Sequence, residues 1–159
     1  MKTLKDFLKD WNMSELQLNL HFLSLKWEPK AADQTAAWDL YVELLTRIST
    51  QALPAGHGDE KTALTSVYSL FETIRTIIKK NGKECLNFAK IAIPVLNQIV
   101  RPFTAHWHKA SLAGAFDKPD QCRLFRTELA ALQQKLNQFT ILLAALADVE
   151  DISYLEAQL

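Results

Sequence analysis

The sequence has few of the residues that interrupt regular structure or build common sites. Only 4 glycines and 5 prolines occur in 159 residues, which is typical of long helices joined by few turns. The two cysteines, Cys85 and Cys122, lie far apart and belong to no CxxC pair, so a structural zinc site is not expected. We expect two reduced thiols in a cytoplasmic protein, with a single disulfide as the alternative.

The sequence also lacks an excess of charge and a long apolar run. Lys+Arg and Asp+Glu both number 18, whereas a protein that coats nucleic acid needs surplus positive charge. The longest clean apolar run, ILLAALA at 141–147, is too short to cross a bilayer. The N-terminus, MKTLKDFLKDWN, alternates charged and apolar residues and is not a signal peptide. We therefore expect no membrane association.

What is present is the composition of one globular domain, 48% hydrophobic and 23% charged, which is enough to bury a core. We predict an all-α fold: an up-down bundle of four main helices with an N-terminal helix and an extended arm, for which a β-strand is the alternative. Residues 1–159 would form a single helical domain. Within it, 1–30 would be the N-terminal helix and arm, 31–147 the bundle and 148–159 an acidic tail.

The N-terminal helix is predicted over residues 3–11. Its charged residues fall on one side, and its apolar stripe consists of Leu4, Phe7, Leu8 and Trp11. The polar side carries both signs of charge rather than the basic excess of a membrane-surface helix. We expect this helix to pack on the chain itself or on a partner.

Residues 14–28 change to a period of two. In SELQLNLHFLSLKWEP, apolar residues alternate with polar ones, as in a half-buried strand. No second strand pattern occurs, so this segment would pair with another chain or across a dimer axis. The alternative is a short helix or an extended arm lying on the bundle. As an arm that binds a partner, it would use Leu16, Leu18, Leu20, Phe22 and Trp27.

Helical periodicity predicts the first two bundle helices. The first begins at Ala31 and fades near Gln51, with a stripe formed by Trp38, Tyr41, Val42, Leu45 and Ile48. The second follows the loop LPAGHGDE at 53–60, is capped by Asp59 and stops at Gly82. Its predicted buried face consists of Leu64, Val67, Phe71, Ile74 and Ile78.

The third helical region runs from about Glu84 to Ala113, and Pro94 and Pro102 should kink or break it. Its apolar stripe consists of Phe88, Ala92, Val95, Ile99, Phe103 and Trp107. The fourth helix starts with Pro119 as its first helical residue. Its apolar seam has the 4, 3 spacing of a heptad pattern and consists of Phe125, Leu129, Leu132, Leu136, Phe139, Leu143 and Leu146. We expect this seam to face the other helices of the bundle.

The stretch RPFTAHWHK, 101–109, combines an arginine with two histidines. At about 100° per residue, one face of a helix would carry the core residues Val100, Phe103 and Trp107. The nearly opposite face would carry Arg101, Thr104 and His108. His106 points between the two faces, and residues two apart diverge on a helix, so we expect no metal site here.

This stretch resembles the Rx4–6H motif of the HEPN superfamily, because Arg101–His106 has the x4 spacing and Arg101–His108 the x6 spacing. The resemblance implies an all-helical, metal-independent endoribonuclease in which two protomers meet at a shared cleft. Arg101, His106 and His108 would then be catalytic, with histidine moving a proton and arginine stabilising the phosphorane charge. Where the family usually has a polar residue after the arginine, this chain has Pro102.

The segment AAWDLYVELLTRISTQ is similar to small helical bacterial proteins found beside defence genes, which implies an accessory role there. The chain lacks GxxxxGK[ST], GxGxxG, GxSxG and HExxH motifs. Positive charge gathers around one loop, at Lys79, Lys80, Lys83 and Lys90, and would suit RNA or an acidic partner.

We therefore predict a non-catalytic interaction module that is a homo-oligomer or binds a protein partner, with no cofactor. The alternative is the HEPN-like ribonuclease, for which RNA is the partner. A third hypothesis is a small-ligand sensor with a pocket opened by Pro94 and Pro102.

Overall fold

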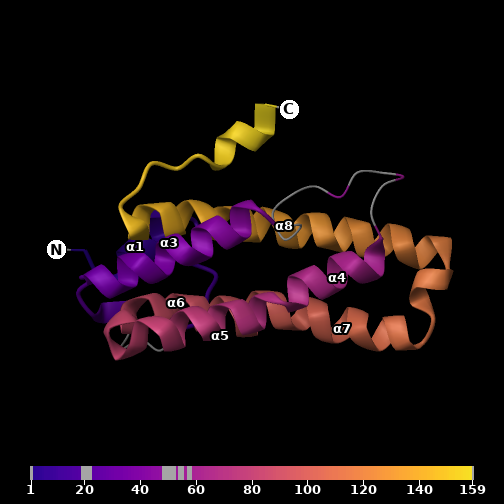
Figure 1. Cartoon of the computed structure of the whole chain (residues 1–159), viewed down its shortest axis with the longest axis horizontal. Coiled ribbons are helices and arrows are strands. Elements are labelled where there is room, and N and C mark those ends of the chain that lie inside the picture. The colour runs from indigo at the N-terminus through magenta and orange to yellow at the C-terminus, as the bar shows by residue number, and fades with distance from the viewer. Residues whose placement is uncertain (1, 19–22, 48–52, 54–55, 57–58, 159) are drawn as a thin grey trace.

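The computed structural model describes residues 2–18, 23–47, 53, 56 and 59–158, with side chains described as far as Leu155 (Figure 1). The predicted all-α class is confirmed, and the described residues contain no strand. The α-helices are α1 (Leu4–Asp10), α3 (Ala31–Leu45), α4 (Glu60–Tyr68), α5 (Leu70–Asn81), α6 (Leu86–Val95), α7 (Arg101–Leu112) and α8 (Pro119–Ala147). A π-helical turn covers Leu96–Val100, and 3₁₀ turns cover Gly82–Cys85, Ala115–Asp117 and Ser153–Gln158.

The longest helix, α8, lies alongside α3 and carries much of the core (Figure 1). It begins at Pro119, as predicted. Every residue of its predicted seam is at most 5% exposed, so the seam packs within this chain. Over the ranges that the structure describes, no helix is both long and apolar enough to span a membrane.

Helix α3 buries a different face from the one predicted. Trp38 and Val42, which we assigned to the buried stripe, are exposed. Tyr41 is buried as predicted, and the rest of the core face consists of Ala36, Ala37, Leu40 and Leu44. The helix ends at Leu45, whereas the predicted end near Gln51 and the stripe residue Ile48 lie outside the described residues.

The predicted second helix is two helices, because α4 ends and α5 begins at Ser69. The Asp59 carboxylate caps α4 by accepting from the Thr62 amide at 2.9 Å, as predicted. Gly82 ends α5 with a φ of 70°, a left-handed value that favours glycine. The predicted buried face is correct except that Ile78 is only partly buried.

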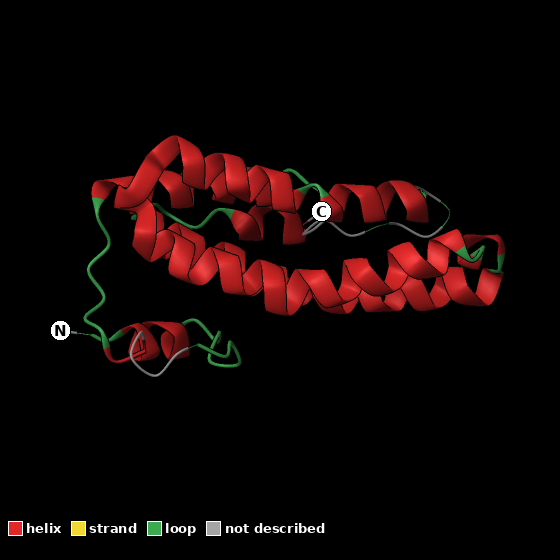
Figure 2. Ribbon diagram, turned by 90° about the horizontal axis from the view of Figure 1, so that it is seen from below, coloured by secondary structure: helices red, strands yellow, loops and turns green. Residues whose placement is uncertain are grey.

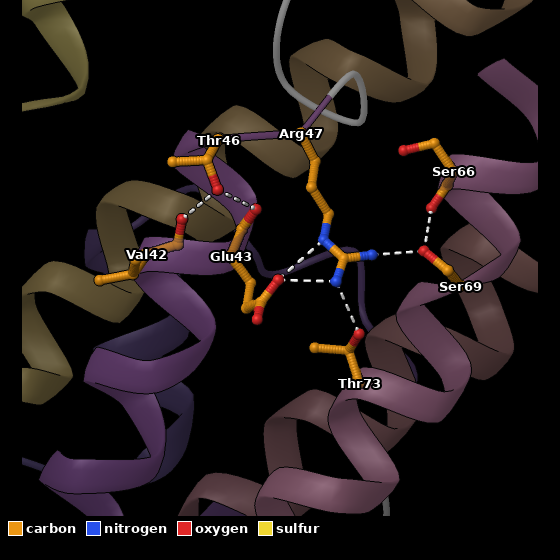
Figure 3. A network of polar contacts seen from close by, with 7 residues as sticks. All are labelled: Val42, Glu43, Thr46, Arg47, Ser66, Ser69 and Thr73. Carbon is orange, nitrogen blue, oxygen red and sulfur yellow. Dashed lines mark hydrogen bonds and ion pairs between the residues drawn. The ribbon is translucent and has the colours of Figure 1, made fainter. Parts of the chain in front are cut away.

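Arg47 ties the end of α3 to the α4–α5 junction (Figure 3). Its guanidinium donates to the Glu43 carboxylate at 2.6 and 2.9 Å, to Thr73 Oγ1 at 2.9 Å and to Ser69 Oγ. The Ser69 hydroxyl donates in turn to the Ser66 carbonyl at 2.6 Å. The junction is therefore held by the Ser69 side chain between the two helices, by Thr73 of α5, by a backbone carbonyl of α4 and by Glu43 of α3.

Helices α6 and α7 are joined without a break, although Pro94 and Pro102 were expected to kink or break the region. Between them the Arg101 amide donates to the Leu96 carbonyl, five residues back, so the turn is π-helical. In an α-helix, a proline ring clashes with the carbonyl four residues before it, and proline has no backbone N–H to donate. The wider π-helical turn makes room for the Pro102 ring and does not require a hydrogen bond from its nitrogen. Pro94 lies inside α6.

Helix α1 and the described part of the arm lie on one side of the long helices and join α3 through residues 27–30 (Figure 2). Leu4 and Leu8 are buried, and the Phe7 ring stacks on Trp27 at 4.8 Å, so α1 packs on its own chain. Within 14–28, the described residues form turns, two helical residues at 23–24 and one bridge to Thr3. The short backbone pairing we expected with another chain is made here with residues 2–4.

The buried carboxylate of Asp33 connects the starts of two helices. It accepts from the Lys30 amide at 2.7 Å, which caps its own helix α3. Its other oxygen accepts from the Phe88 amide at 2.8 Å in the first turn of α6. The side-chain amide of Asn87 donates to the same carboxylate at 3.2 Å. Asp33 is 0% exposed, so these contacts replace all of its hydration.

Candidate functional site

The structure places Arg101 and His108 on the side of α7 that meets the α4–α5 junction. The Arg101 guanidinium lies 4.6 Å from the centre of the Phe71 ring and donates to Asn97 Oδ1 at 3.1 and 3.2 Å. His108 packs edge-on against Tyr68 with the ring centres 4.8 Å apart. This side is therefore a packing face in part: Thr104, which we expected on an exposed face, is 2% exposed and His108 is half-buried, whereas Arg101 is exposed.

The predicted core face of this stretch is correct. Val100, Phe103 and Trp107 are buried, and the Trp107 indole donates to Glu128 Oε2 at 2.7 Å. His106 is exposed and packs edge-on against Trp107, away from the Arg101 side. In the described part of the chain, no three His, Cys, Asp or Glu side chains converge as metal ligands would.

A depression of about 300 Å³ lies beside His108. Its lining consists of Lys61, Leu64, Thr65, His108, Ser111 and Leu112. Arg101 and His106 do not line it. The structure thus brings His108 to a polar surface with one lysine, but it does not gather the three residues of the motif in one cavity.

The predicted partner-binding residues of the arm have mixed positions. Leu16 is 5% exposed and belongs to the core, and Trp27 is partly buried against it. Leu20 and Phe22 lie outside the described residues. Leu18 is partly buried and lines a groove between the arm and α6.

This groove, which we call the α6 groove, is the strongest candidate for a functional surface. It has a volume of about 460 Å³, and its lining consists of Gln17, Leu18, Leu86, Ala89, Lys90, Ile93 and Pro94. The α6 residues recur at helical spacing along one face. Leu86 is 59% exposed and Ile93 is 45% exposed, so large apolar side chains remain in contact with water there.

The arm wall of the α6 groove is held by the π-helical turn. Gln98 projects from that turn, accepts from the Gln17 amide at 2.8 Å and donates to the Gln17 carbonyl at 2.7 Å. A side-chain amide thus pairs with the arm backbone as a neighbouring strand would. Because Leu18 is the next residue, this pairing fixes the position of its side chain beside α6.

Charged residues of both signs lie near the α6 groove. Lys90 lines it, and exposed Lys83 lies one turn before Leu86. Two acidic residues lie at the same end: Glu84, which pairs with Lys30 at 2.8 Å, and Glu28, whose carbonyl accepts from the Asn87 side chain at 3.0 Å. Of the four lysines that the sequence grouped, Lys83 and Lys90 therefore lie next to an apolar surface.

The sequence interpretation missed Leu86, Ala89 and Ile93, and it named Pro94 only for the pocket of the ligand-sensor hypothesis. It assigned the apolar stripe of α6 and the π-helical turn to Phe88, Ala92, Val95 and Ile99, of which the first three are buried and Ile99 is partly buried. Leu86 and Ile93 are apolar residues on another side of the same helix. A helix with two apolar faces is expected to bury both, and the second face then needs a second packing partner. This second apolar face was the signal in the sequence that could have indicated the groove.

The chain was compared with protein-family models, curated proteins and solved structures, and it matches none of them.

Proposed function

We propose that this chain is a non-catalytic docking module that binds an apolar, acidic segment of a protein in the α6 groove. The observation that carries the proposal is the row of exposed apolar side chains at Leu86 and Ile93 beside Leu18. Isolated exposed leucines are common, but a contiguous apolar groove with a charged rim is typical of an interaction site.

We infer that the scaffold is an up-down bundle of four units: α3, α4–α5, α6–α7 and α8. Support comes from Figure 1, where successive units run in alternating directions, and from the buried α8 seam. A rigid bundle suits a docking function because it presents a preformed surface and so avoids an ordering cost on binding. Docking without catalysis also fits the accessory role implied by the similarity to defence-associated proteins.

Burial of Leu86 and Ile93 by a partner would supply the binding energy. Full burial of one large aliphatic side chain contributes about 1.5–3 kcal/mol, and a few such contacts dominate most interfaces. A helix laid against α6 would contact the residues that recur every three or four positions. Lys90 and Lys83 at the edge would favour acidic residues on that segment.

The test is affinity purification of the tagged chain from its source cells, with Ile93→Asp as the groove variant. The control is Leu112→Asp, since Leu112 is 92% exposed and lies at the end of α7. We expect a stoichiometric protein that is retained by the wild type and the control and lost with Ile93→Asp. Identical protein profiles for all three chains would refute a docking role for the α6 groove.

A second candidate is the HEPN-like, metal-independent ribonuclease. The observation that favours it is that Arg101 and His108 lie on the same side of α7, with Lys61 beside His108. The experiment is cleavage of single-stranded RNA in EDTA by the wild type and by Arg101→Ala, His106→Ala and His108→Ala. A ribonuclease of this kind loses at least 100-fold in rate with Arg101→Ala and His108→Ala. RNA that stays intact with the wild type excludes this function.

A further inference from the structure

Helix α1 and the start of the arm enclose a hollow of their own, which we call the α1 hollow. The chain turns sharply after α1, where the Met13 amide donates to the Leu8 carbonyl at 2.8 Å and Asn12 has a left-handed φ of 60°. The hollow has a volume of about 340 Å³. Among the described residues, its lining consists of Lys5, Leu8, Lys9, Ser14, Leu16 and Leu23.

The apolar part of the α1 hollow consists of three leucines. Leu8 is 1% exposed and Leu16 is 5% exposed, so the core holds both in place, and half-buried Leu23 packs against that core. An alkyl chain that displaces water from leucine side chains is bound favourably. Small-molecule pockets have volumes of roughly 300–1,000 Å³, and this hollow lies near the lower end of that range. It therefore suits one short alkyl chain rather than a two-chain lipid.

Two lysines at the edge of the α1 hollow supply positive charge. Lys5 and Lys9 are four residues apart on α1, so they lie on the same side of the helix. Both are exposed, and within the described part of the chain neither makes a hydrogen bond or an ion pair. The aliphatic part of a lysine can lie along an apolar surface while its ammonium group stays in water. An anionic group above the leucines can therefore contact both ammonium groups.

The acidic residues nearest in sequence do not line the α1 hollow and have other roles. The Asp6 carboxylate accepts from the Thr3 amide at 3.2 Å and from the Thr3 hydroxyl at 2.9 Å, and these bonds lower its pKa more than the two lysines do. Asp10 pairs with Lys2 at 2.6 Å. Glu15 lines a different hollow. The charged groups of the α1 hollow itself are thus both positive.

We propose that the α1 hollow binds a free medium-chain fatty acid, with its carboxylate at Lys5 and Lys9 and its alkyl chain against the three leucines. Ser14 also lines the hollow, and its hydroxyl can donate to the same carboxylate. A neutral amphiphile keeps the apolar contacts but loses the two charge contacts, and a cationic one is repelled by the lysines. This binding site is separate from the α6 groove and does not depend on the docking function.

The first measurement is isothermal titration calorimetry with octanoate, which is ionised at neutral pH, and with 1-octanol, which has the same alkyl chain without the charge. We expect octanoate to bind at one site and more tightly than octanol. The double variant Lys5→Gln, Lys9→Gln should bind octanoate roughly three-fold to ten-fold more weakly and octanol equally well, and both altered residues are exposed, so folding is retained.

The matched control is Lys79→Gln, Lys83→Gln, which changes two exposed lysines at the same four-residue spacing. Its octanoate affinity should equal that of the wild type. The proposal is overturned by a wild type that does not bind octanoate. It is also overturned by an affinity that falls equally in both double variants, because the binding would then reflect overall charge.

The second measurement locates the ligand by NMR of the 18.1 kDa chain labelled with nitrogen-15. Octanoate should shift the backbone amides of Leu8, Ser14, Leu16 and Leu23 most strongly, and shifts confined to other helices would refute the site. Flotation with vesicles of phosphatidylglycerol distinguishes a free fatty acid from a membrane surface. We expect the chain to stay with the soluble fraction. Vesicle binding by a chain that does not bind octanoate would replace the proposed ligand with a lipid surface.

Discussion

Asp33 shows how one side chain can fix the relative position of two distant segments. Its carboxylate accepts hydrogen bonds from the first turns of both α3 and α6, which are more than fifty residues apart. Negative charge at the start of a helix is favourable because the first amide groups have no partners within the helix. Asp33 therefore serves as a cap for α3 and for α6, whose own cap residue, Cys85, makes no side-chain cap bond.

Replacement of Asp33 by alanine should lower the free energy of unfolding by about 3 kcal/mol or more. The change leaves the buried amide of Phe88 and the partly buried amide of Lys30 without acceptors, and loss of a buried acceptor costs roughly 1–3 kcal/mol. Urea denaturation measures the effect. The control is Asp39→Ala, since Asp39 pairs loosely with exposed Lys80 at 3.4 Å and should matter by less than about 0.5 kcal/mol. Equal losses in both variants would contradict the capping role.

The two thiols should react at very different rates in the folded chain. Cys85 is 0% exposed and donates to the Gly82 carbonyl at 3.2 Å, and burial raises its pKa above the ordinary value. We expect a thiol reagent to modify only Cys122 under native conditions, and both cysteines in denaturant. The control is the Cys122→Ser chain, which should show no rapid labelling. Rapid labelling of that chain would mean that Cys85 is accessible.

The raised pKa of Cys85 also gives a direction for stability against pH. The folded thiol stays protonated at a pH where the unfolded thiol, with a pKa of about 8.5, has begun to ionise. Its contribution to stability is therefore fully present below that pH and declines as pH rises further. Urea midpoints between pH 7 and 10 should fall less steeply for Cys85→Ala than for the wild type. Parallel pH profiles would count against this assignment.

At the scale of elements, the helices differ in how far their buried faces could be predicted. The apolar residues of the α8 seam are spaced so regularly that the sequence indicates a single buried face, and the structure confirms it. Helix α3 has apolar residues on two faces, and the aromatic stripe containing Trp38 was the wrong one. The face that is buried carries Ala36 and Ala37, and short side chains allow neighbouring helices to approach closely.

The alternating pattern of residues 14–28 misled for a related reason. Periodicity indicates which side chains are buried, but it does not show whether the backbone that carries them forms a turn, a helix or a strand. The single bridge to Thr3 satisfies backbone groups that would otherwise have required a partner strand. Likewise, the spacing of Glu43 and Arg47 by four residues predicts no more than a surface ion pair, because the sequence does not show that Ser69 and Thr73 lie within reach of Arg47.

Gln98→Ala should loosen the arm without unfolding the helices. It removes both bonds to the Gln17 backbone, so the Gln17 amide should exchange with deuterium faster by an order of magnitude or more. Global stability should fall by only about 1 kcal/mol, because the bonded groups are exposed. Hydrogen exchange with mass spectrometry tests this. Asn97→Ala, in the same turn, removes a contact to Arg101 and is the matched control. Arm protection that is unchanged in Gln98→Ala would contradict the proposed pairing.

At the scale of the whole molecule, the α6 groove is one of the apolar surfaces that the fold leaves uncovered. The candidate site was only partly predictable for that reason. Arg101 and His108 could be placed on one face of a helix, but the sequence did not show that Tyr68 and Phe71 contact that face and bury Thr104 while Arg101 stays exposed. Which apolar face stays exposed depends on how all the helices pack together, and no local pattern contains that information.

The uncovered surface should tolerate charge where the core does not. The free energy of unfolding of the double variant Leu86→Asp, Ile93→Asp should differ from that of the wild type by no more than about 1 kcal/mol, because both side chains already contact water. Ile91→Asp, on the same helix, should not fold stably, since Ile91 is 1% exposed and a buried, unpaired charge is very costly. Circular dichroism with thermal unfolding compares them. Severe destabilisation by the double variant would show that Leu86 and Ile93 belong to the core.

The π-helical turn sets the alignment of every residue that follows it in the long helix. Its Arg101–Leu96 bond spans one residue more than an α-helical bond does, so the turn amounts to a one-residue insertion. Removal of one residue between Leu96 and Val100 would restore ordinary helix but rotate α7 by about 100°. That rotation would carry the Trp107 indole away from Glu128. Related chains should therefore accept changes in the identity of these residues far more readily than changes in their number.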